Sequence, residues 1–222
     1  MTSGFSDGVP FAISYAMAVH DFRAQRLYVT TELQPDREVS LHDGQAHYLA
    51  NVLRMSLGDA ILLFDGRNGE WRSVVTALKK REVRLQVEIQ TRPQMAGPDI
   101  TYVFAPLKRA RLDYMVQKAV ELGVAKLQPA LTRRTVADRV NLDRMQANAI
   151  EAAEQCGVLH LPELAPPKKF ADIITEWDAA RPLIFCDESA DISDPVEALR
   201  QVPVGPVGLI FGPEGGFDDE ER

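Results

Sequence analysis

The stretch GLIFGPEGGF (residues 208–217) indicates the fold class more sharply than any other part of the chain. The apolar run Val207–Phe211 predicts a buried strand, and three glycines follow it within five residues. Glycine permits positive φ and lets the backbone approach a ligand closely. Such a loop after a parallel strand lies where open α/β sheets bind ligands. Its spacing fits neither a P-loop nor a dinucleotide fingerprint. The alternative is a tight strand-to-helix turn that binds nothing.

The C-terminal half of the chain alternates between apolar runs and amphipathic stretches. Apolar residues fall at helical spacing over 109–122, and Gly123 is suited to end that helix. Alternating strands and helices predict an α/β fold with a mainly parallel sheet covered on both faces. The strands are expected at Ile100–Ala105, Lys126–Leu131, Leu183–Cys186 and Val207–Phe211, and the other helices at Asn141–Cys156 and Lys168–Ala180.

The N-terminal part has a different pattern, with short strands and one helix. Apolar and polar residues alternate along Val83–Ile89, which is typical of a strand with one wet face. Asp65–Gly69 has the composition of a hairpin loop. These features predict a small β-barrel of the PUA or OB type. The expected elements are strands at 27–30, 60–64, 71–78 and 83–89, and a helix at 45–54.

A linker with two prolines and a glycine separates the two parts within Thr91–Asp99. We therefore expect a disordered leader at 1–22, a β-barrel domain at 23–92, the linker proper at 93–99 and the α/β domain at 100–222. Asp218 and Asp219 are good helix N-cap residues, yet the sequence stops at Arg222. One turn cannot sustain a helix, so we expect the α/β domain to be truncated at its C-terminus.

The apolar stretch Val9–Val19 near the N-terminus has no Lys or Arg before it. A disordered leader, or a true start at Met17, is therefore favoured over a signal peptide. No apolar run approaches the ~20 residues that span a bilayer. Two cysteines, Cys156 and Cys186, are too few for a disulfide scaffold, and no Cys or His pair has metal-ligand spacing. We expect a cytoplasmic protein with no membrane segment and no metal site.

The net charge of −7, from 25 basic and 32 acidic residues, argues against a nucleic-acid partner if it is taken as an average. Its distribution changes that conclusion. Residues 106–145 hold nine basic and four acidic residues, a net +5, whereas 146–222 hold five basic and sixteen acidic residues, a net −11. The acidic excess thus comes from one stretch, and an RNA partner is not excluded.

Two basic clusters follow predicted strands of the sheet. Lys108, Arg109 and Arg111 lie at a helix start, where cations oppose the helix dipole and an anionic partner would compensate. Arg133 and Arg134 follow the next strand. Solvated charged turns are the alternative for each cluster, but two basic loops at the same sheet edge as a glycine loop favour anion binding.

Two further motifs lie on predicted helices. Glu151, Glu154 and Gln155 share one helical face, and His47 and Arg54 are seven residues apart on another helix. An ordinary amphipathic helix and a surface histidine are the alternatives to a functional role.

Taken in order, these segments resemble the family of ribosomal RNA small-subunit uridine N3-methyltransferases, within the SPOUT (α/β-knot) superfamily. The resemblance covers about Arg26 to Arg222, and the QKAVELG, EAAEQ and GPEGG segments together are specific. The residues that carry it are His47, Val52–Arg54, Lys108, Gln117–Gly123, Arg134, Glu151–Gln155, Pro162–Glu163, Gly212–Gly216 and Glu221.

The resemblance implies S-adenosylmethionine as cofactor, N3 of a uridine in 16S rRNA as target, and the 30S subunit as the setting. It implies a homodimer, since superfamily members generally form one. No residue qualifies as the base that removes the N3 proton. The implied catalytic residues are Arg109 and Arg134. The implied cofactor-binding residues are Phe211, Gly212, Pro213, Glu214, Gly215 and Gly216. The implied RNA-binding residues are Arg54, Lys108, Arg109, Arg111, Arg133 and Arg134.

Two departures from the family pattern stand out. The run Gly157–Pro162 lacks the arginine that usually follows the EQ segment, and the segment that completes the knot after GPEGG is absent. A chain ending at Arg222 is therefore expected to bind S-adenosylmethionine poorly. The remaining alternatives are a SPOUT methyltransferase acting on another rRNA position or on tRNA, and an RNA-binding module without catalysis.

Overall fold

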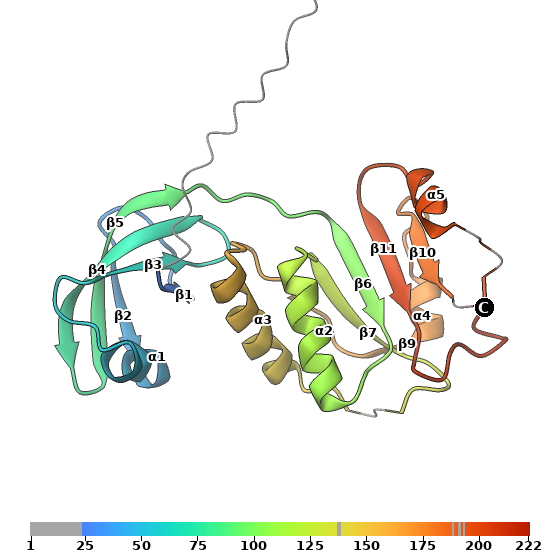
Figure 1. Cartoon of the computed structure of the whole chain (residues 1–222), viewed down its shortest axis with the longest axis horizontal. Coiled ribbons are helices and arrows are strands. Elements are labelled where there is room, and N and C mark those ends of the chain that lie inside the picture. Colours follow the sequence, from blue (N-terminus) through green and yellow to red (C-terminus); the bar gives the residue numbers. More distant parts are fainter. Residues whose placement is uncertain (1–23, 137–138, 188, 191, 193) are drawn as a thin grey trace, which may run out of the picture.

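The computed structural model describes residues 24–136, 139–187, 189–190, 192 and 194–222. The expected leader and the alternative start at Met17 lie outside these residues. Within them, no helix is long and apolar enough to cross a membrane. The described residues form two sheets, each with its own hydrophobic core (Figure 1).

The N-terminal sheet is mixed and has the strand order β1-β3-β4-β5-β2. Strand β1 pairs with β3 in parallel, and the other pairs are antiparallel. Alternate residues of β5, Val83, Leu85 and Val87, are fully buried, as the alternation in the sequence predicts. The alternation fails at Ile89, which is 62% exposed because a register shift between Val87 and Ile89 turns its side chain outward. Register shifts along β4 and β5 mark bulges that bend the sheet. The strands are β1 (Arg26–Tyr28), β2 (Glu38–His42), β3 (Ala60–Phe64), β4 (Glu70–Lys79) and β5 (Glu82–Arg92).

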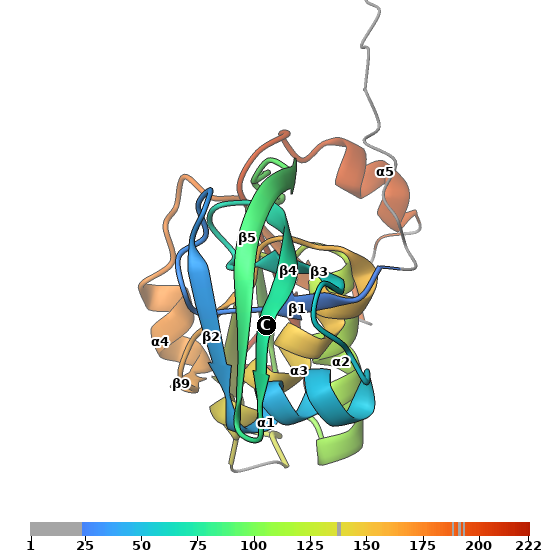
Figure 2. The ribbon, with the colours of Figure 1, turned by 90° about the vertical axis from the view of Figure 1, so that its left-hand side faces the viewer.

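The helix expected at 45–54 is in fact two short elements, α1 (Asp43–His47) and the π-helical turn η1 (Tyr48–Val52). The backbone changes pitch because Leu53 N donates to Tyr48 O, five residues back, at 2.9 Å. Strand β2 was not predicted, because only two of its five residues are apolar. Figure 2 shows α1 beside the lower ends of β2, β4 and β5.

The second sheet has the order β10-β11-β6-β7-β8, with β9 also pairing with β7, and every one of these pairs is parallel. The predicted α/β fold with a mainly parallel sheet is thus confirmed. Because β11 returns to the side of β6 away from β7, the strand order reverses at β6. The strands are β6 (Ile100–Phe104), β7 (Lys126–Leu131), β8 (Glu163–Leu164), β9 (Lys168–Lys169), β10 (Leu183–Cys186) and β11 (Val207–Phe211).

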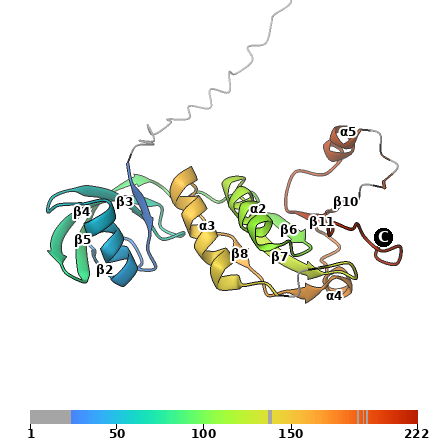
Figure 3. The same ribbon diagram turned by 60° about the horizontal axis from the view of Figure 1, so that its bottom comes forward.

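Helices cover this sheet on both faces (Figure 3). On one face lie α2 (Arg109–Glu121) and α3 (Leu142–Cys156), whose small residues let the helices approach each other closely. On the other lies α4 (Phe170–Thr175). Asn141 caps α3 by accepting from Arg144 N at 2.9 Å, and Gly157, at φ 82°, ends it.

The helix expected at 168–180 was wrong in both its start and its length. Lys168 and Lys169 extend the sheet as β9, and α4 ends at Thr175. The chain then turns so that the Trp177 ring packs on Gly208, where a Cβ would lie 2.2 Å from the indole. A further helix, α5 (Pro195–Arg200), was not predicted, although Asp194 caps it and proline occupies its first turn.

A buried arginine joins the two sheets. The Arg26 guanidinium bonds Glu70 Oε2 at 2.7 Å and donates to Ala153 O and Val158 O at 2.5 and 3.2 Å. Those carbonyls lie at the C-terminus of α3, where a cation is favoured. On the Glu70 side, Arg92 completes the cluster at 2.7 Å. Burial alone raises the pKa of the Glu70 carboxyl, but hydrogen bonds from Arg92 and Arg26 outweigh it and bring that pKa to about 2.

Candidate functional site

The carboxyl ends of parallel strands lie at one edge of the sheet, at the bottom in Figure 1. Three loops leave the sheet there. We call them the basic loop (Pro106–Arg111, whose last three residues begin α2), the arginine turn (Thr132–Thr135) and the glycine loop (Gly212–Phe217). They follow β6, β7 and β11, the strands at which the order reverses. Ligands of open α/β sheets bind at such a position.

The glycine loop is anchored at its far end by an aromatic ring. Phe217 is 3% exposed, and its ring centroid lies 4.4 Å from that of Phe185 and 5.5 Å from that of Phe170. A Cβ on Gly212 would lie 2.5 Å from the Phe217 ring, so only glycine fits there. Gly216 has φ 71°, a left-handed conformation that also favours glycine. Packing and backbone conformation therefore fix the shape of the glycine loop.

Two arginines hold the exposed part of the glycine loop. Arg134 of the arginine turn donates to Gly215 O at 3.0 Å, and Arg111 of the basic loop pairs with Glu214. A Cβ on Gly215 would meet only the Arg134 side chain, at 3.8 Å. The outer side of Gly215 is therefore open to a ligand, and the three loops predicted from the sequence do meet at one edge.

The arginine turn also contacts the end of the described chain. Arg133 N donates to Glu221 Oε1 at 2.8 Å, and its guanidinium pairs with Asp218 at 3.1 Å and with Glu220. The hydrogen bond to Glu220 raises the pKa of Arg133 above its usual value. Thr132 and Thr135 close the turn through a 2.8 Å bond between their hydroxyls. These exposed ion pairs are weak, so an anionic ligand can replace the carboxylates.

Lys108 and Arg109 begin α2 at the same edge. Within the described part of the chain, neither side chain makes a hydrogen bond or an ion pair. Arg144 and Asn148 instead occupy the nearby Asp113 carboxylate, which lowers the pKa of Asp113. Lys108 and Arg109 thus remain available to an anionic ligand at the helix N-terminus.

Arg54 is not part of this edge. It follows η1 in the N-terminal sheet region and has φ 54°, a left-handed conformation that costs a non-glycine residue about 1 kcal/mol. Strain of this kind persists where the surrounding structure or a function requires the residue. The predicted RNA-binding residues therefore fall on two separate parts of the molecule.

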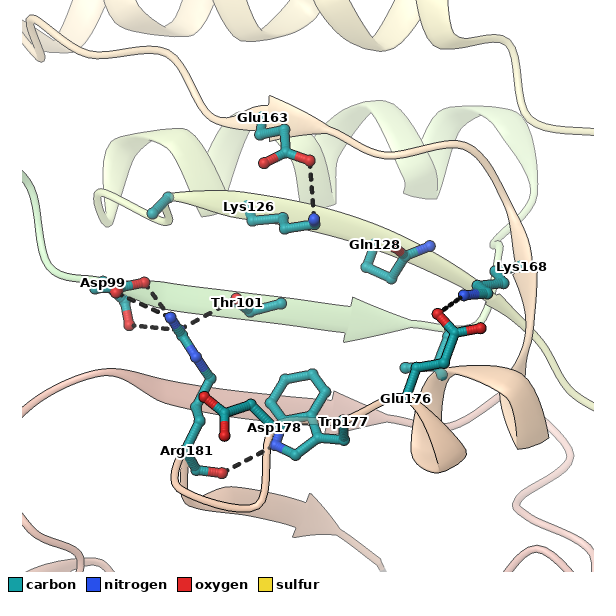
Figure 4. Close-up of a pocket in the computed structure, with 12 residues that line it drawn as sticks. Asp99, Thr101, Lys126, Gln128, Glu163, Lys168, Glu176, Trp177, Asp178 and Arg181 are labelled. Atoms are coloured by element: carbon teal, nitrogen blue, oxygen red, sulfur yellow. Dashed lines mark hydrogen bonds and ion pairs between the residues drawn. The ribbon is translucent and has the colours of Figure 1, made fainter.

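A groove of about 500 Å³ lies elsewhere on the parallel sheet, and of its residues only Glu163 was singled out from the sequence (Figure 4). It opens on the amino halves of β6 and β7. Its charged side chains neutralise one another: Arg181 pairs with Asp99 at 2.8 and 2.9 Å, Lys126 with Glu163 at 2.8 Å, and Lys168 with Glu176. The groove lacks the unpaired cations and the glycine-rich backbone of the carboxyl edge.

Comparison with known families identifies the domain that carries this edge. The sequence model of a family described as an RNA methyltransferase domain matches residues 95–222. This match covers more than half of the chain and contains all three loops. The chain belongs to the RNA methyltransferase family. A second family, described as an RNA methyltransferase PUA domain, matches residues 41–88, so a PUA domain precedes the methyltransferase domain.

Relatives with curated descriptions include two proteins named ribosomal RNA small subunit methyltransferase E. The one from Synechocystis is 30% identical over 89% of this chain and 66% of its own length. The one from Rickettsia conorii is 25% identical over 88% and 80%.

Solved structures show the same two-part architecture. A putative methyltransferase from Legionella pneumophila, solved with S-adenosylmethionine, is 30% identical and has a TM-score of 0.74 over 90% of this chain and 84% of its own. Ribosomal RNA small subunit methyltransferase E from Neisseria gonorrhoeae, also bound to S-adenosylmethionine, is 26% identical with a TM-score of 0.76 over 89% and 83%.

Proposed function

We propose that this RNA methyltransferase transfers the methyl group of S-adenosylmethionine to N3 of one uridine in 16S rRNA. The observation that carries the proposal is the convergence of the glycine loop with two arginine-bearing loops at the carboxyl edge of the family's domain. Relatives named for small-subunit rRNA methylation support the substrate, and two S-adenosylmethionine complexes support the cofactor. We keep the domain limits 23–92, 93–99 and 100–222 as part of the proposal.

The glycine loop fits a cofactor on structural grounds. Its outer side is open at Gly215, while Gly212 and Phe217 hold the backbone in place from below. We assign cofactor binding to Phe211–Gly216, chiefly through backbone groups. Glu214 is held by Arg111 and thereby fixes the loop against the basic loop.

N3 of uridine carries a proton, and its lone pair is delocalised into the adjoining carbonyls. The proton must leave N3 as the new N3–carbon bond forms and the sulfur–carbon bond breaks. S-adenosylmethionine supplies the electrophilic methyl group. Arg109 and Arg134 stabilise the negative charge that develops on the uracil oxygens, and the loops hold the base in line. We assign no base: Glu214, the carboxylate of the glycine loop, is already paired with Arg111.

Lys108, Arg109, Arg111, Arg133 and Arg134 bind the RNA backbone near the target, and Arg54 binds it from the PUA domain. We further propose a homodimer that acts in the cytoplasm on the 30S subunit. These parts of the proposal rest on the resemblance stated above.

The test is transfer of labelled methyl groups by the complete gene product. Unmodified 30S subunits, naked 16S rRNA, 50S subunits and tRNA are offered separately with labelled S-adenosylmethionine. We expect label only in 16S rRNA. Label in tRNA or in 50S subunits would favour a methyltransferase that acts on tRNA or on another rRNA position. RNA binding without any methyl transfer would favour an RNA-binding module without catalysis.

Replacing Arg54 by glycine separates its structural role from its role in RNA binding. Because Arg54 has φ 54°, the Arg54→Gly variant is expected to be about 0.5–1 kcal/mol more stable, yet to bind 16S rRNA several-fold more weakly. Thermal unfolding and filter binding measure the two effects. Asp36→Gly, at φ 59°, is the matched control, and it should gain stability without losing RNA affinity. Unchanged RNA binding by Arg54→Gly would remove Arg54 from the interface.

A further inference from the structure

The hairpin between β4 and β5 has an unusual loop. Lys79 pairs with Glu82 across the strands, so the loop consists of two residues, Lys80 and Arg81. Two-residue hairpin loops favour Asn-Gly, because the turns that match the strand twist require positive φ. Here both positions carry long cationic side chains. The tip therefore carries two positive charges in place of the residues that favour a two-residue turn.

The backbone φ angles show that this turn is not one of the preferred types. Among the described residues other than glycine, positive φ occurs only at Asp36, Asp43 and Arg54. Lys80 and Arg81 therefore close the hairpin without the left-handed conformations that the preferred turns use. A departure from the usual residue preferences of a hairpin turn is expected at functional sites.

The two loop cations are also unpaired, unlike their neighbours. Glu82 binds Lys79 at 3.0 Å and Arg84 at 2.6 Å, and Arg84 also lies 3.5 Å from Glu38. Within the described residues, Lys80 and Arg81 have no such partner. Both are exposed. Residues 79–84 hold four basic residues and one acidic, a net +3.

The hairpin tip lies on the same side of the molecule as the carboxyl edge. His42, the residue before α1, pairs with Glu82, so α1 begins beside the tip. Figures 1 and 2 both show the tip, α1 and the start of α2 at the bottom of the molecule. Two acidic residues lie close to the tip: Glu82, which follows Arg81 and is bound to Lys79 and Arg84, and Asp43 in the first turn of α1. An RNA that spans from the PUA domain to the carboxyl edge would pass this face.

We propose that Lys80 and Arg81 at the β4–β5 hairpin tip bind RNA phosphates and form an anchor point for the substrate outside the reacting edge. This inference rests on the proposed function, because it takes the methyltransferase's RNA as the ligand. It adds a contact on the PUA domain that lies apart from Arg54. Two phosphate contacts of this kind increase the RNA affinity and its salt dependence, but they do not select a base sequence.

The test replaces the tip by the turn that hairpins prefer. Lys80→Asn/Arg81→Gly removes both cations and supplies a favourable loop, so folding is retained. We expect the variant to bind unmodified 16S rRNA transcript about five- to tenfold more weakly, with a salt slope smaller by about 1.5. Arg37→Gln/Arg67→Gln is the control, since it removes two exposed cations at the other end of the same sheet. The control should change neither quantity.

Several outcomes decide the matter. Equal losses in the tip variant and the control would reduce the effect to net charge and overturn the anchor. A loss seen with 30S subunits but not with naked rRNA would overturn it in favour of a contact with a ribosomal protein. If the parent protein transfers no methyl group yet the tip variant loses rRNA affinity, the proposed function fails and the anchor stands. If the parent methylates and the tip variant binds normally, only the anchor fails.

Discussion

Gly215→Val is expected to weaken S-adenosylmethionine binding at least about 100-fold and to leave the fold intact. A Cβ at Gly215 would meet only the Arg134 side chain, at 3.8 Å, and the residue does not need positive φ. The protein itself therefore tolerates the larger side chain. A cofactor held against the loop backbone does not, because the valine would occupy the space that the ligand needs. Calorimetric titration of the complete gene product measures the affinity.

Gly44→Val is the matched control, because a Cβ there meets nothing within 4 Å and the residue lies in α1, away from the glycine loop. It should bind the cofactor as the parent does. Unchanged affinity in Gly215→Val would remove the glycine loop from the cofactor site. A fall in affinity accompanied by a lower unfolding temperature would show that the valine acts through the fold instead.

Glu70→Gln is expected to cost about 3–5 kcal/mol of unfolding free energy at pH 7. The change leaves the Arg26 guanidinium buried without its carboxylate, and removing one partner of a buried ion pair costs about that much. Glu197→Gln, which breaks the exposed pair with Arg200, is the control and should cost less than about 0.5 kcal/mol. Denaturant unfolding followed by circular dichroism measures both.

The same carboxylate predicts a pH dependence. Its pKa is about 2 in the folded protein against an ordinary 4.5, so its stabilising contribution is present above pH 4.5. Roughly 3 kcal/mol of it is lost as the pH falls from 4.5 to 2. The stability difference between the parent protein and Glu70→Gln should therefore shrink over that range. A difference that stays constant from pH 7 to pH 2.5 would contradict the assignment.

The sequence predicted those elements whose signal is local. The strand at 207–211 and the helix at 109–122 agree with β11 and α2, because burial pattern, glycine and apolar spacing all favour the same structure. The three loops could be placed at one edge because parallel strands share a direction. Strand β2 and helix α5 carry too few apolar residues to be seen.

The contacts that join the two sheets could not be predicted. Arg26 donates a hydrogen bond to Ala153 O, which lies 127 residues further along the chain. The local sequence around neither residue indicates this contact. The premature end of α4 has a similar origin, since the packing of Trp177 on Gly208 is a tertiary contact. The same holds for the hairpin tip, where Lys80 and Arg81 lack the residues from which a hairpin is recognised.

The central claim is a modification of one defined atom. The complete gene product is incubated with S-adenosylmethionine and unmodified 30S subunits, and the 16S rRNA is then digested to nucleosides and analysed by mass spectrometry against methyluridine standards. The account predicts N3-methyluridine, approaching one per rRNA molecule. A methyl group on carbon 5, on the ribose or on another base would contradict it, as would the absence of any methylated nucleoside above the untreated control.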